Sequence, residues 1–446
     1  MSTTVSNPPY AVIVGLGATG LSCARHLLLR GWRVAVTDTR AAPPQLAALH
    51  ALDASVVVRA GGLDPALLEG AVCVIASPGV PLTEPFFGAA RRRGLTIVGD
   101  VELFARAVDA PVAGITGTNG KSTVTTLLAR MAQRAGVRVR AGGNLGPPAL
   151  DLLSAGTELY VLELSSYQLE TSETLECRAA TVLNVSPDHL DRYDSLASYA
   201  AAKARIFARC DTAVINLDDP LVVAMPRAAR RTLSFSLRAT IGADYAVAMQ
   251  EGSWWLTRAG TALMPVTDLK IKGLHNAANA LAALALGEAV GLPLAAMLAE
   301  LTEFAGLPHR SQWVADVAGV TYIDDSKGTN VGATLAAVAG MPGPLIMIAG
   351  GDGKNQDFAP LAAAFRGKVR HAVLIGRDAP RLAQALAGVC TLESCSTLPQ
   401  AVRAAARAAR PGDTVLLSPA CASLDMFRDY GHRGAVFAAA VQELAA

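Results

Sequence analysis

The chain has 446 residues, of which 52% are hydrophobic and 17% charged, and this composition excludes an intrinsically disordered protein. Its 39 Lys and Arg residues nearly balance its 37 Asp and Glu residues, so neither a nucleic acid nor a membrane surface is expected as a partner. No apolar run reaches the roughly 18 residues of a membrane span, the N-terminus lacks a signal-peptide pattern, and the seven cysteines form no CxxC pair. We therefore expect a cytoplasmic protein of about three domains with reduced thiols.

The first hundred residues alternate short β-branched segments with helical ones. Strands are predicted at 11–17, 32–38, 54–60, 71–79 and 95–100. Strands that alternate with helices predict a parallel sheet with right-handed crossovers. The unit ends near Gly99, so we assign residues 1–99 to a first domain.

Two further alternating units follow. The second unit covers residues 100–306. It has a long helix, predicted to be buried, at 273–292 and extra strand patterns at 232–237 and 253–257. Its other strand-like stretches begin at Ala110, Arg138, Glu158, Ala179 and Thr212. Gly and Pro residues within 304–312 mark the next boundary. The third unit, residues 307–446, has strand-like stretches that begin at Gly319, Gly343, His371 and Asp413. The sequence thus predicts an α/β protein with three domains in series.

A glycine-rich loop follows the first predicted strand. Gly15, Gly17 and Gly20 match the pattern G-x-G-x-x-G, and Asp38 ends the next strand. Such glycines permit a tight turn and a close approach to a pyrophosphate, whose charge the helix N-terminus attracts. Three interpretations remain open on this evidence: a nicotinamide dinucleotide site, a site for another nucleotide, or a turn that only packs the helix against the strand.

A second loop, "GITGTNGKST", predicts a site for a nucleoside triphosphate. Its successive backbone N–H groups can surround phosphate oxygens, its lysine can reach the outer phosphates, and a hydroxyl can bind Mg²⁺. The residues concerned are Gly117, Thr118, Asn119, Gly120, Lys121, Ser122 and Thr123. The loop departs from the strict eight-residue pattern because Ile115 occupies the position of the leading glycine. The alternative is a loop with a purely structural role.

Acidic residues follow two later strands. Glu163 comes where a carboxylate would meet a metal ion held on the phosphates, although such a residue can also be solvated or cap a helix. The stretch "SPDHLDRY" offers Asp188, His189 and Asp191. Its alternative interpretation is a helix start, for which Ser and Pro are well suited.

Taken in order, several stretches resemble the Mur ligase family of peptidoglycan synthesis. They are "GTNGKST", "GGNLG", "ELSSYQLE", "NVSPDHLDRY", "GLHNAANALAA", "HRSQ", "DDSKGTN", "AGGDGKNQDF" and "LLSPACASLDMF". The resemblance runs from about residue 11 to the C-terminus. It implies a Rossmann-like N-terminal domain, a central P-loop NTPase-like domain that binds a mononucleotide, and a C-terminal Rossmann-like α/β domain.

The family resemblance also implies a reaction. An ATP-dependent ligase of this kind forms an amide through an acyl phosphate, and the motifs favour the member that adds D-glutamate to UDP-N-acetylmuramoyl-L-alanine. The first loop would then hold the UDP part of a sugar nucleotide rather than NAD. The partners expected are these small molecules and ATP, with no nucleic acid or membrane, and the protein is expected to be a monomer.

Site residues follow from the resemblance, position by position. The residues implied to bind the UDP substrate are Gly17, Ala18, Thr19, Asp38, Thr39, Arg40, Ser77, Pro78, Gly79 and Asn144. Those implied in catalysis are Lys121, Glu163, His189, Lys203 and Lys327. Two Mg²⁺ ions are implied, one bound by Ser122 and Glu163 and the other by His189 and a carbamylated Lys203. Without the resemblance, Lys203 would be read as a surface lysine on a basic helix.

The remaining implied residues bind ATP and glutamate. Besides the phosphate loop, the ATP site is expected to include Asn276, Asn279, Arg310 and Asp325. The glutamate site is expected to include Thr329, Lys354, Ser423, Leu424 and Tyr430. Tyr430 replaces the phenylalanine expected from the family pattern.

Two other enzymatic functions and one non-enzymatic function remain to be weighed. One is a different ATP-dependent amino-acid ligase of the same superfamily. The other is a nicotinamide-dependent dehydrogenase built on residues 11–100, which would leave Lys121 and Lys354 without a role. A nucleotide-regulated binding module is a third possibility, and it would leave the "DHLDRY" and "DDSKGTN" clusters unused.

Overall fold

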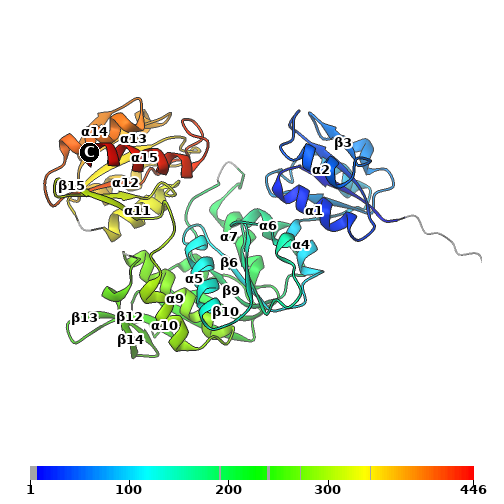
Figure 1. The fold of residues 1–446 in the computed structure, drawn as a ribbon, viewed down its shortest axis with the longest axis horizontal. Coiled ribbons are helices and arrows are strands. Elements are labelled where there is room, and N and C mark those ends of the chain that lie inside the picture. Colours follow the sequence, from blue (N-terminus) through cyan, green and yellow to red (C-terminus); the bar gives the residue numbers. More distant parts are fainter. Residues whose placement is uncertain (1–7, 190–191, 239–241, 272, 342, 446) are drawn as a thin grey trace, which may run out of the picture.

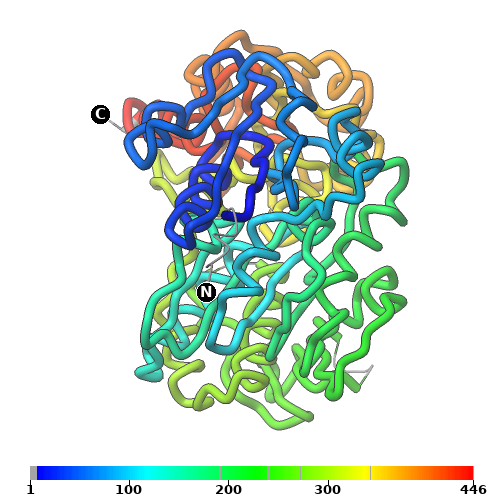
Figure 2. The backbone as a smooth tube through the Cα atoms, turned by 90° about the vertical axis from the view of Figure 1, so that its right-hand side faces the viewer, coloured from blue at the N-terminus to red at the C-terminus, as the bar shows by residue number. Residues whose placement is uncertain are grey.

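The computed structural model describes residues 8–189, 192–238, 242–271, 273–341 and 343–445. Within these residues the strands form three sheets, of five, nine and six strands, in chain order. Figure 1 shows the N-terminal and C-terminal sheets on the same side of the central one, and the rotated view in Figure 2 agrees. The fold is therefore α/β with three domains in series, as predicted.

The N-terminal sheet is entirely parallel, with the order β3-β2-β1-β4-β5. Its strands are β1 (Tyr10–Val14), β2 (Arg33–Asp38), β3 (Val57–Ala60), β4 (Cys73–Ala76) and β5 (Thr96–Val98). Its helices are α1 (Ala18–Leu28), α2 (Leu46–Leu52) and α3 (Pro85–Arg92). Strand order reverses between β1 and β4, which is where an open parallel sheet binds its ligand.

Helix α4 (Asp100–Ala105) joins the N-terminal domain to the central one. It packs against α1 and against the short turn η2 (Ala149–Leu152), which also contact each other. One continuous hydrophobic core extends across this junction, from Ala11 to Met225. The first two domains therefore share buried surface as well as a connecting segment.

The central sheet has the order β14-β13-β12-β11-β10-β9-β6-β8-β7. Its strands are β6 (Val112–Thr116), β7 (Val139–Gly143), β8 (Leu159–Glu163), β9 (Cys177–Val182), β10 (Cys210–Asn216), β11 (Arg231–Ser236), β12 (Tyr245–Gln250), β13 (Ser253–Arg258) and β14 (Thr261–Pro265). Among its described strands, only β12–β13 and β13–β14 pair antiparallel. The helices are α5 (Lys121–Arg134), α6 (Ser166–Glu170), α7 (Leu196–Ala204), α8 (Pro220–Val223), α9 (Leu274–Ala289) and α10 (Leu294–Glu303). Helix α9 is buried along most of its circumference, as its Ala and Leu content predicts.

The C-terminal sheet has the order β15-β16-β20-β17-β18-β19, with β15 antiparallel. Its strands are β15 (Gln312–Val317), β16 (Val320–Asp324), β17 (Leu345–Gly350), β18 (Val369–Ile375), β19 (Thr391–Ser394) and β20 (Thr414–Leu417). Its helices are α11 (Val331–Gly340), α12 (Ala359–Phe365), α13 (Ala379–Ala385), α14 (Leu398–Ala408) and α15 (Tyr430–Ala445).

Two further expectations concern the cysteines and the membrane. All seven cysteines lie in the described part of the chain, and each is a free thiol. Among the described residues, no helix combines the length and the apolar character that crossing a membrane would require.

Candidate active site

The phosphate loop joins β6 to α5, and two of its glycines are required by geometry. Gly117 and Gly120 have φ values of +147° and +84°, which side-chain-bearing residues rarely adopt. A Cβ atom on Gly120 would lie 2.4 Å from the side-chain oxygen of Asn279, and one on Gly117 would lie 3.0 Å from Cβ of Leu183. Glycine thus lets the loop lie directly against α9 and the segment after β9.

Two lysine ammonium groups meet at one carbonyl of this loop. Lys121 Nζ donates to Gly117 O at 2.8 Å and to Thr118 O at 2.8 Å, and Lys203 Nζ donates to Gly117 O at 3.0 Å. The interpretation of Lys203 as a surface lysine is wrong, because its side chain points from α7 into the core and is 1% exposed. Burial lowers the pKa of Lys121, and burial followed by the charge of Lys121 holds the pKa of Lys203 well below its ordinary value.

Glu163, at the end of β8, presents a carboxylate beside the phosphate loop. Its Oε1 accepts a hydrogen bond from Asn144 Nδ2 at 2.6 Å. Its Oε2 is buried and has no hydrogen-bond partner among the described residues. A buried carboxylate oxygen without a donor is costly unless a cation joins it. This oxygen therefore suits a hard cation such as Mg²⁺, and Asn144 orients the carboxylate in this structure.

The segment after β9 carries Ser186, Asp188 and His189 toward the C-terminal domain. The helix-start interpretation of this stretch is wrong for the described residues, because 183–189 are not helical and α7 begins at Leu196; Asp191 lies outside the described residues. His189 has a φ of +55°, an uncommon conformation for a residue with a side chain. Burial lowers the pKa of His189, which favours the neutral imidazole.

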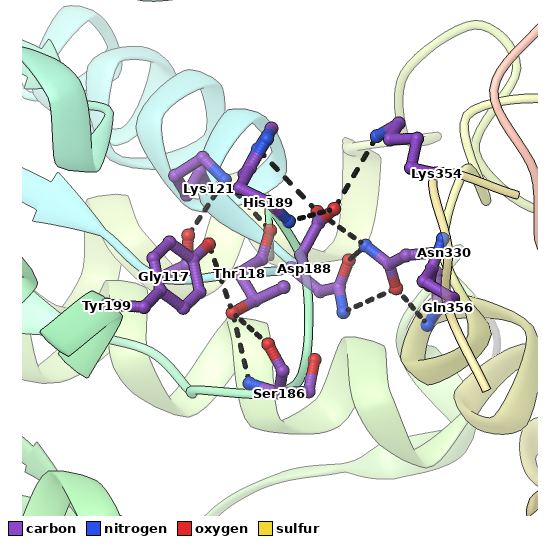
Figure 3. Close-up of polar contacts among 12 residues, drawn as sticks. Gly117, Thr118, Lys121, Ser186, Asp188, His189, Tyr199, Asn330, Lys354 and Gln356 are labelled. Carbon is purple, nitrogen blue, oxygen red and sulfur yellow. Dashed lines mark hydrogen bonds and ion pairs between the residues drawn. The ribbon is translucent and has the colours of Figure 1, made fainter. Parts of the chain in front are cut away.

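Asp188 links the central domain to the C-terminal domain (Figure 3). Its Oδ1 lies 3.5 Å from Lys354 Nζ, and its Oδ2 accepts from Asn330 Nδ2 at 3.1 Å. Burial alone would raise the pKa of Asp188, but the charge of Lys354 and the hydrogen bonds from the His189 backbone N–H and Asn330 outweigh it, and the pKa lies below its ordinary value. The carboxylate is therefore ionised and holds a predicted glutamate-site lysine beside His189.

A cavity of about 350 Å³ opens beside the phosphate loop. It brings together predicted ATP-site residues that are far apart in the sequence, namely Asn119, Gly120, Thr123, Asn276, Asn279, Arg310 and Asp325, with Lys327 beside them. Sequence reasoning missed its apolar wall, which includes Phe235, Ile271 and Leu307, and a histidine, His275. An apolar wall with a few polar groups at one end suits a flat heterocyclic base.

The C-terminal domain contributes charge to the same place. Arg310 Nη2 donates to Ser122 Oγ at 2.8 Å. Asp325 accepts from Ser418 Oγ at 2.8 Å and from Ser311 N at 3.0 Å, and burial raises its pKa to about 6. Burial, with Arg310 and Lys121 nearby, lowers the pKa of Lys327 to about 8. These shifts mark a dry site that already holds an excess of cations.

Only some of the predicted glutamate-site residues lie close to one another. Lys354 reaches Asp188, and the Tyr430 ring lies 3.8 Å from Lys327 Nζ. Ser423 is buried, whereas Leu424 is 73% exposed. Thr329 directly precedes Asn330, the residue that contacts both Asp188 and Asn119. The site for an amino acid would thus lie between the central and C-terminal domains.

The first glycine loop lies in the N-terminal domain, where Gly17 precedes Ala18 and Thr19 at the start of α1. Ser77 Oγ donates to Gly15 O at 3.0 Å, so the loop after β4, which includes Pro78 and Gly79, packs against it. Asp38 accepts from Leu16 N at 2.7 Å and from Arg40, which holds its pKa at about 2. Both carboxylate oxygens are engaged, so Asp38 does not present the free carboxylate that a dinucleotide site needs for ribose. Instead it orients Arg40, next to Thr39.

Comparison with known proteins shows the family. Residues 10–99 match the model of the N-terminal domain of MurD-like Mur ligases, residues 115–287 the Mur ligase middle domain, and residues 309–421 the glutamate ligase domain of Mur ligases. A protein from Nitrosococcus oceani is 53% identical over 97% of this chain and 96% of its own length, and one from Pseudomonas aeruginosa is 50% identical over 99% of each. The chain belongs to the Mur ligase family.

The two Mur ligase relatives are both named UDP-N-acetylmuramoylalanine–D-glutamate ligase. Among solved structures, the UDP-N-acetylmuramate-alanine ligase of Thermotoga maritima aligns with 97% of this Mur ligase and 99% of its own chain, with a TM-score of 0.62 at 19% identity. A pseudomurein peptide ligase from Methanothermus fervidus also gives a TM-score of 0.62, at 17% identity, over 98% of this chain and 100% of its own. These two likenesses support the three-domain fold.

Proposed function

We propose that this Mur ligase joins D-glutamate to UDP-N-acetylmuramoyl-L-alanine, with hydrolysis of ATP to ADP and phosphate, in peptidoglycan precursor synthesis. The observation that carries the proposal is the match, at about half identity and nearly full length, to relatives named for that reaction. The geometry supports it, because the phosphate loop, the cavity beside it and the contacts of Asp188 with Lys354 and Asn330 lie where the central and C-terminal domains face each other.

The chemistry requires activation of a carboxylate. A carboxylate resists nucleophilic attack, so the γ-phosphoryl group of ATP is first transferred to the terminal alanine carboxylate, with release of ADP. The amine of D-glutamate then attacks the acyl phosphate, the amine loses its proton, and inorganic phosphate leaves as the amide forms. Both reactants of the first step are anions, so charge neutralisation and positioning supply most of the catalysis.

The protein's cations suit that requirement. We expect Lys121 and the backbone of 117–120 to hold the phosphates, with Arg310 and Lys327 approaching from the C-terminal domain. Asn276 and Asn279 would contact the base in the cavity, and Lys354 would hold a carboxylate of glutamate. The loops at Gly17, Arg40 and Ser77 would bind the UDP part of the substrate, and Asn144 would contact its sugar-peptide part.

The residues present suit a Mg²⁺ ion at one site, whereas a second site requires a modified lysine. The orphaned Oε2 of Glu163 and the hydroxyl of Ser122 are suitable for one ion. The described residues contain no group of three or more His, Cys, Asp or Glu side chains that could hold a metal alone. We propose that His189 and carbamylated Lys203 hold a second ion, with substrate oxygens completing both sites. When bound, Mg²⁺ screens the repulsion between the triphosphate and the carboxylate.

We also propose three domains, at residues 1–99, 100–306 and 307–446. The first would bind mainly the UDP substrate, the second ATP and the third the amino acid. A cytoplasmic monomer is the expected working state, since ATP and free thiols fit that compartment. Light scattering of the purified protein would test the monomer.

One assay tests the function. The protein is mixed with Mg²⁺, ATP, UDP-N-acetylmuramoyl-L-alanine and D-glutamate, and phosphate release and product mass are followed. We expect phosphate release that requires all substrates and a product heavier by one glutamyl residue. Release without D-glutamate, preference for another amino acid, or NADH-dependent turnover would each contradict the proposal.

A further inference from the structure

Arg192 connects the N-terminal domain to the catalytic segment of the central domain. Its Nη1 donates to Pro78 O at 2.9 Å, and its Nη2 donates to Val80 O at 3.1 Å. The acceptors belong to the loop after β4, 114 and 112 positions earlier in the chain. A planar guanidinium can satisfy two carbonyls at once in a fixed geometry, which a lysine cannot.

The loop that Arg192 holds forms one wall of the proposed UDP site. Ser77 Oγ donates to Gly15 O, and a Cβ atom on Gly15 would lie 2.9 Å from Ser77 Cβ and 3.3 Å from Val80 Cγ2. The loop after β4 and the first glycine loop are therefore packed as a unit. Whatever fixes Pro78 and Val80 also fixes the two loops that would hold the diphosphate.

On its other side, Arg192 belongs to the segment that carries His189. The backbone N–H of Arg192 donates to His189 O at 3.0 Å. The guanidinium lies 4.0 Å above the Tyr167 ring, and the Tyr167 and His189 ring centroids are 5.2 Å apart. A cation over an aromatic face is attracted by the ring, which stabilises this arrangement. The side chain is thus held at a set distance from the imidazole.

The aromatic cluster continues to the phosphate loop. Tyr199, 1% exposed, lies with its ring centroid 6.1 Å from that of His189, and its hydroxyl accepts from Thr118 Oγ1 at 3.4 Å. Lys203 Nζ lies 4.4 Å from the centre of the same ring. Closely packed rings have a low compressibility, so a displacement of one ring also displaces its neighbours. A chain of contacts therefore runs from Val80, through Arg192 and the rings, to the loop that contains Thr118.

We propose that Arg192 is a positioning residue that sets the distance between the UDP-binding loops and the phosphate loop. This role rests on the proposed function. The substrate is bound at its nucleotide end and reacts at its alanine carboxylate, so the spacing of the two sites decides where that carboxylate lies relative to the γ-phosphate. An error of about 1 Å in such a placement can cost about 10²-fold in rate.

The test compares Arg192→Ala and Arg192→Lys with the wild-type protein and with Arg25→Ala. Arg25 is a matched control because it also crosses the junction between the first two domains, through an ion pair with Asp151 at 2.9 Å, but contacts neither binding loop. Measured quantities are kcat, the KM values for the UDP substrate and for ATP, the Kd for UDP alone, and the thermal unfolding midpoint. The wild-type rate is measured first, and its absence would refute the proposed function rather than the role of Arg192.

We expect Arg192→Ala to lower kcat by about 10- to 100-fold while the Kd for UDP and the KM for ATP change by less than about threefold. Arg192→Lys should recover part of kcat, since one hydrogen bond can form, and Arg25→Ala should leave kcat within about twofold. The proposal is overturned if Arg192→Ala keeps kcat, or if UDP affinity and unfolding midpoint fall in step with kcat. Should Arg192→Ala not fold, the same criteria applied to Arg192→Lys decide.

Discussion

Lys121 and Lys203 donate hydrogen bonds to the same oxygen, the backbone carbonyl of Gly117. Lys203 is nearly fully buried, so two ammonium groups face each other across one acceptor with little water between them. Burial, and after it the repulsion from Lys121, lowers the pKa of Lys203 and favours its neutral amine, which is the form that reacts with carbon dioxide. Carbamylation would replace a repulsive pair by an attractive one, because the carbamate is an anion beside Lys121.

The first prediction follows from the change of charge at Lys203 on carbamylation. Lys203→Ala should reduce kcat by about 10²- to 10³-fold, and millimolar formate or acetate should restore part of it by supplying a carboxylate in the space vacated. Ligase rates measured with and without added carboxylic acid check this. Lys203→Arg, which fills the space but forms no carbamate, should show no rescue. A well-folded Lys203→Ala protein that short acids fail to activate would count against carbamylation.

The second prediction concerns Lys121 itself. Lys121→Ala should lower kcat by about 10³-fold or more, because the γ-phosphate loses the ammonium that both positions and neutralises it. Lys270→Ala, which removes an exposed lysine of the same domain, should keep the wild-type rate. The measurement is phosphate release with all substrates saturating. Near-normal turnover by Lys121→Ala would remove the phosphate loop from the proposed reaction.

Local patterns predicted the architecture well, because alternation and glycine spacing are properties of neighbouring residues. Val12, Val36 and Ile348 are fully buried, and the strands that contain them were recognised by their apolar runs. Strands β12, β14, β15 and β19 were missed. Three of them, β14, β15 and β19, lie at sheet edges, where the apolar run is short or interrupted.

Contacts between domains could not be predicted from such patterns. Asp188 meets Lys354 across 166 positions, and Arg192 meets Pro78 across 114, so nothing local marks either pair. The burial of Lys203 is a further case, since the three alanines that precede it in α7 do not distinguish a buried face from an exposed one. The family resemblance identified Lys203 as a site residue, whereas only the structure revealed that it is buried.

The third prediction uses the pKa of Lys327, which burial lowers to about 8. At pH 8 about half of the Lys327 side chains are neutral in the free protein. A bound triphosphate favours the ammonium and raises this pKa, so binding of a non-hydrolysable ATP analogue at pH 8 should take up protons. Calorimetric titration in two buffers of different ionisation enthalpy measures the uptake.

Two variants control the third prediction. Lys327→Arg should reduce the uptake, because a guanidinium does not titrate in this range, whereas Lys270→Arg should leave it unchanged. Equal apparent enthalpies in both buffers for the wild-type protein would refute the expected coupling.

The fourth prediction concerns stability away from the site. Glu288, near the end of α9, accepts from Arg258 Nε at 2.8 Å and from the Tyr245 hydroxyl at 2.7 Å, and it contacts Arg231. These donors, Arg258 foremost, lower its pKa from 4.5 to about 2. Because the folded value lies below the unfolded one, the stabilisation is complete above about pH 4.5 and declines as the pH falls toward 2.

Glu288→Gln should therefore destabilise the protein by about 1–2 kcal/mol at pH 7, a figure reduced for the partial exposure of the partners. The difference between variant and wild type should shrink as the pH falls from about 4.5 toward 2, between the unfolded and folded pKa values of Glu288. Glu303→Gln is the matched control, because Glu303 pairs with Arg134 but its side chain is 57% exposed, and it should cost little at any pH. Denaturant unfolding at several pH values measures both variants. If Glu288→Gln loses the same free energy of unfolding at every pH measured, the packing of the Glu288 side chain rather than its charge accounts for the stabilisation.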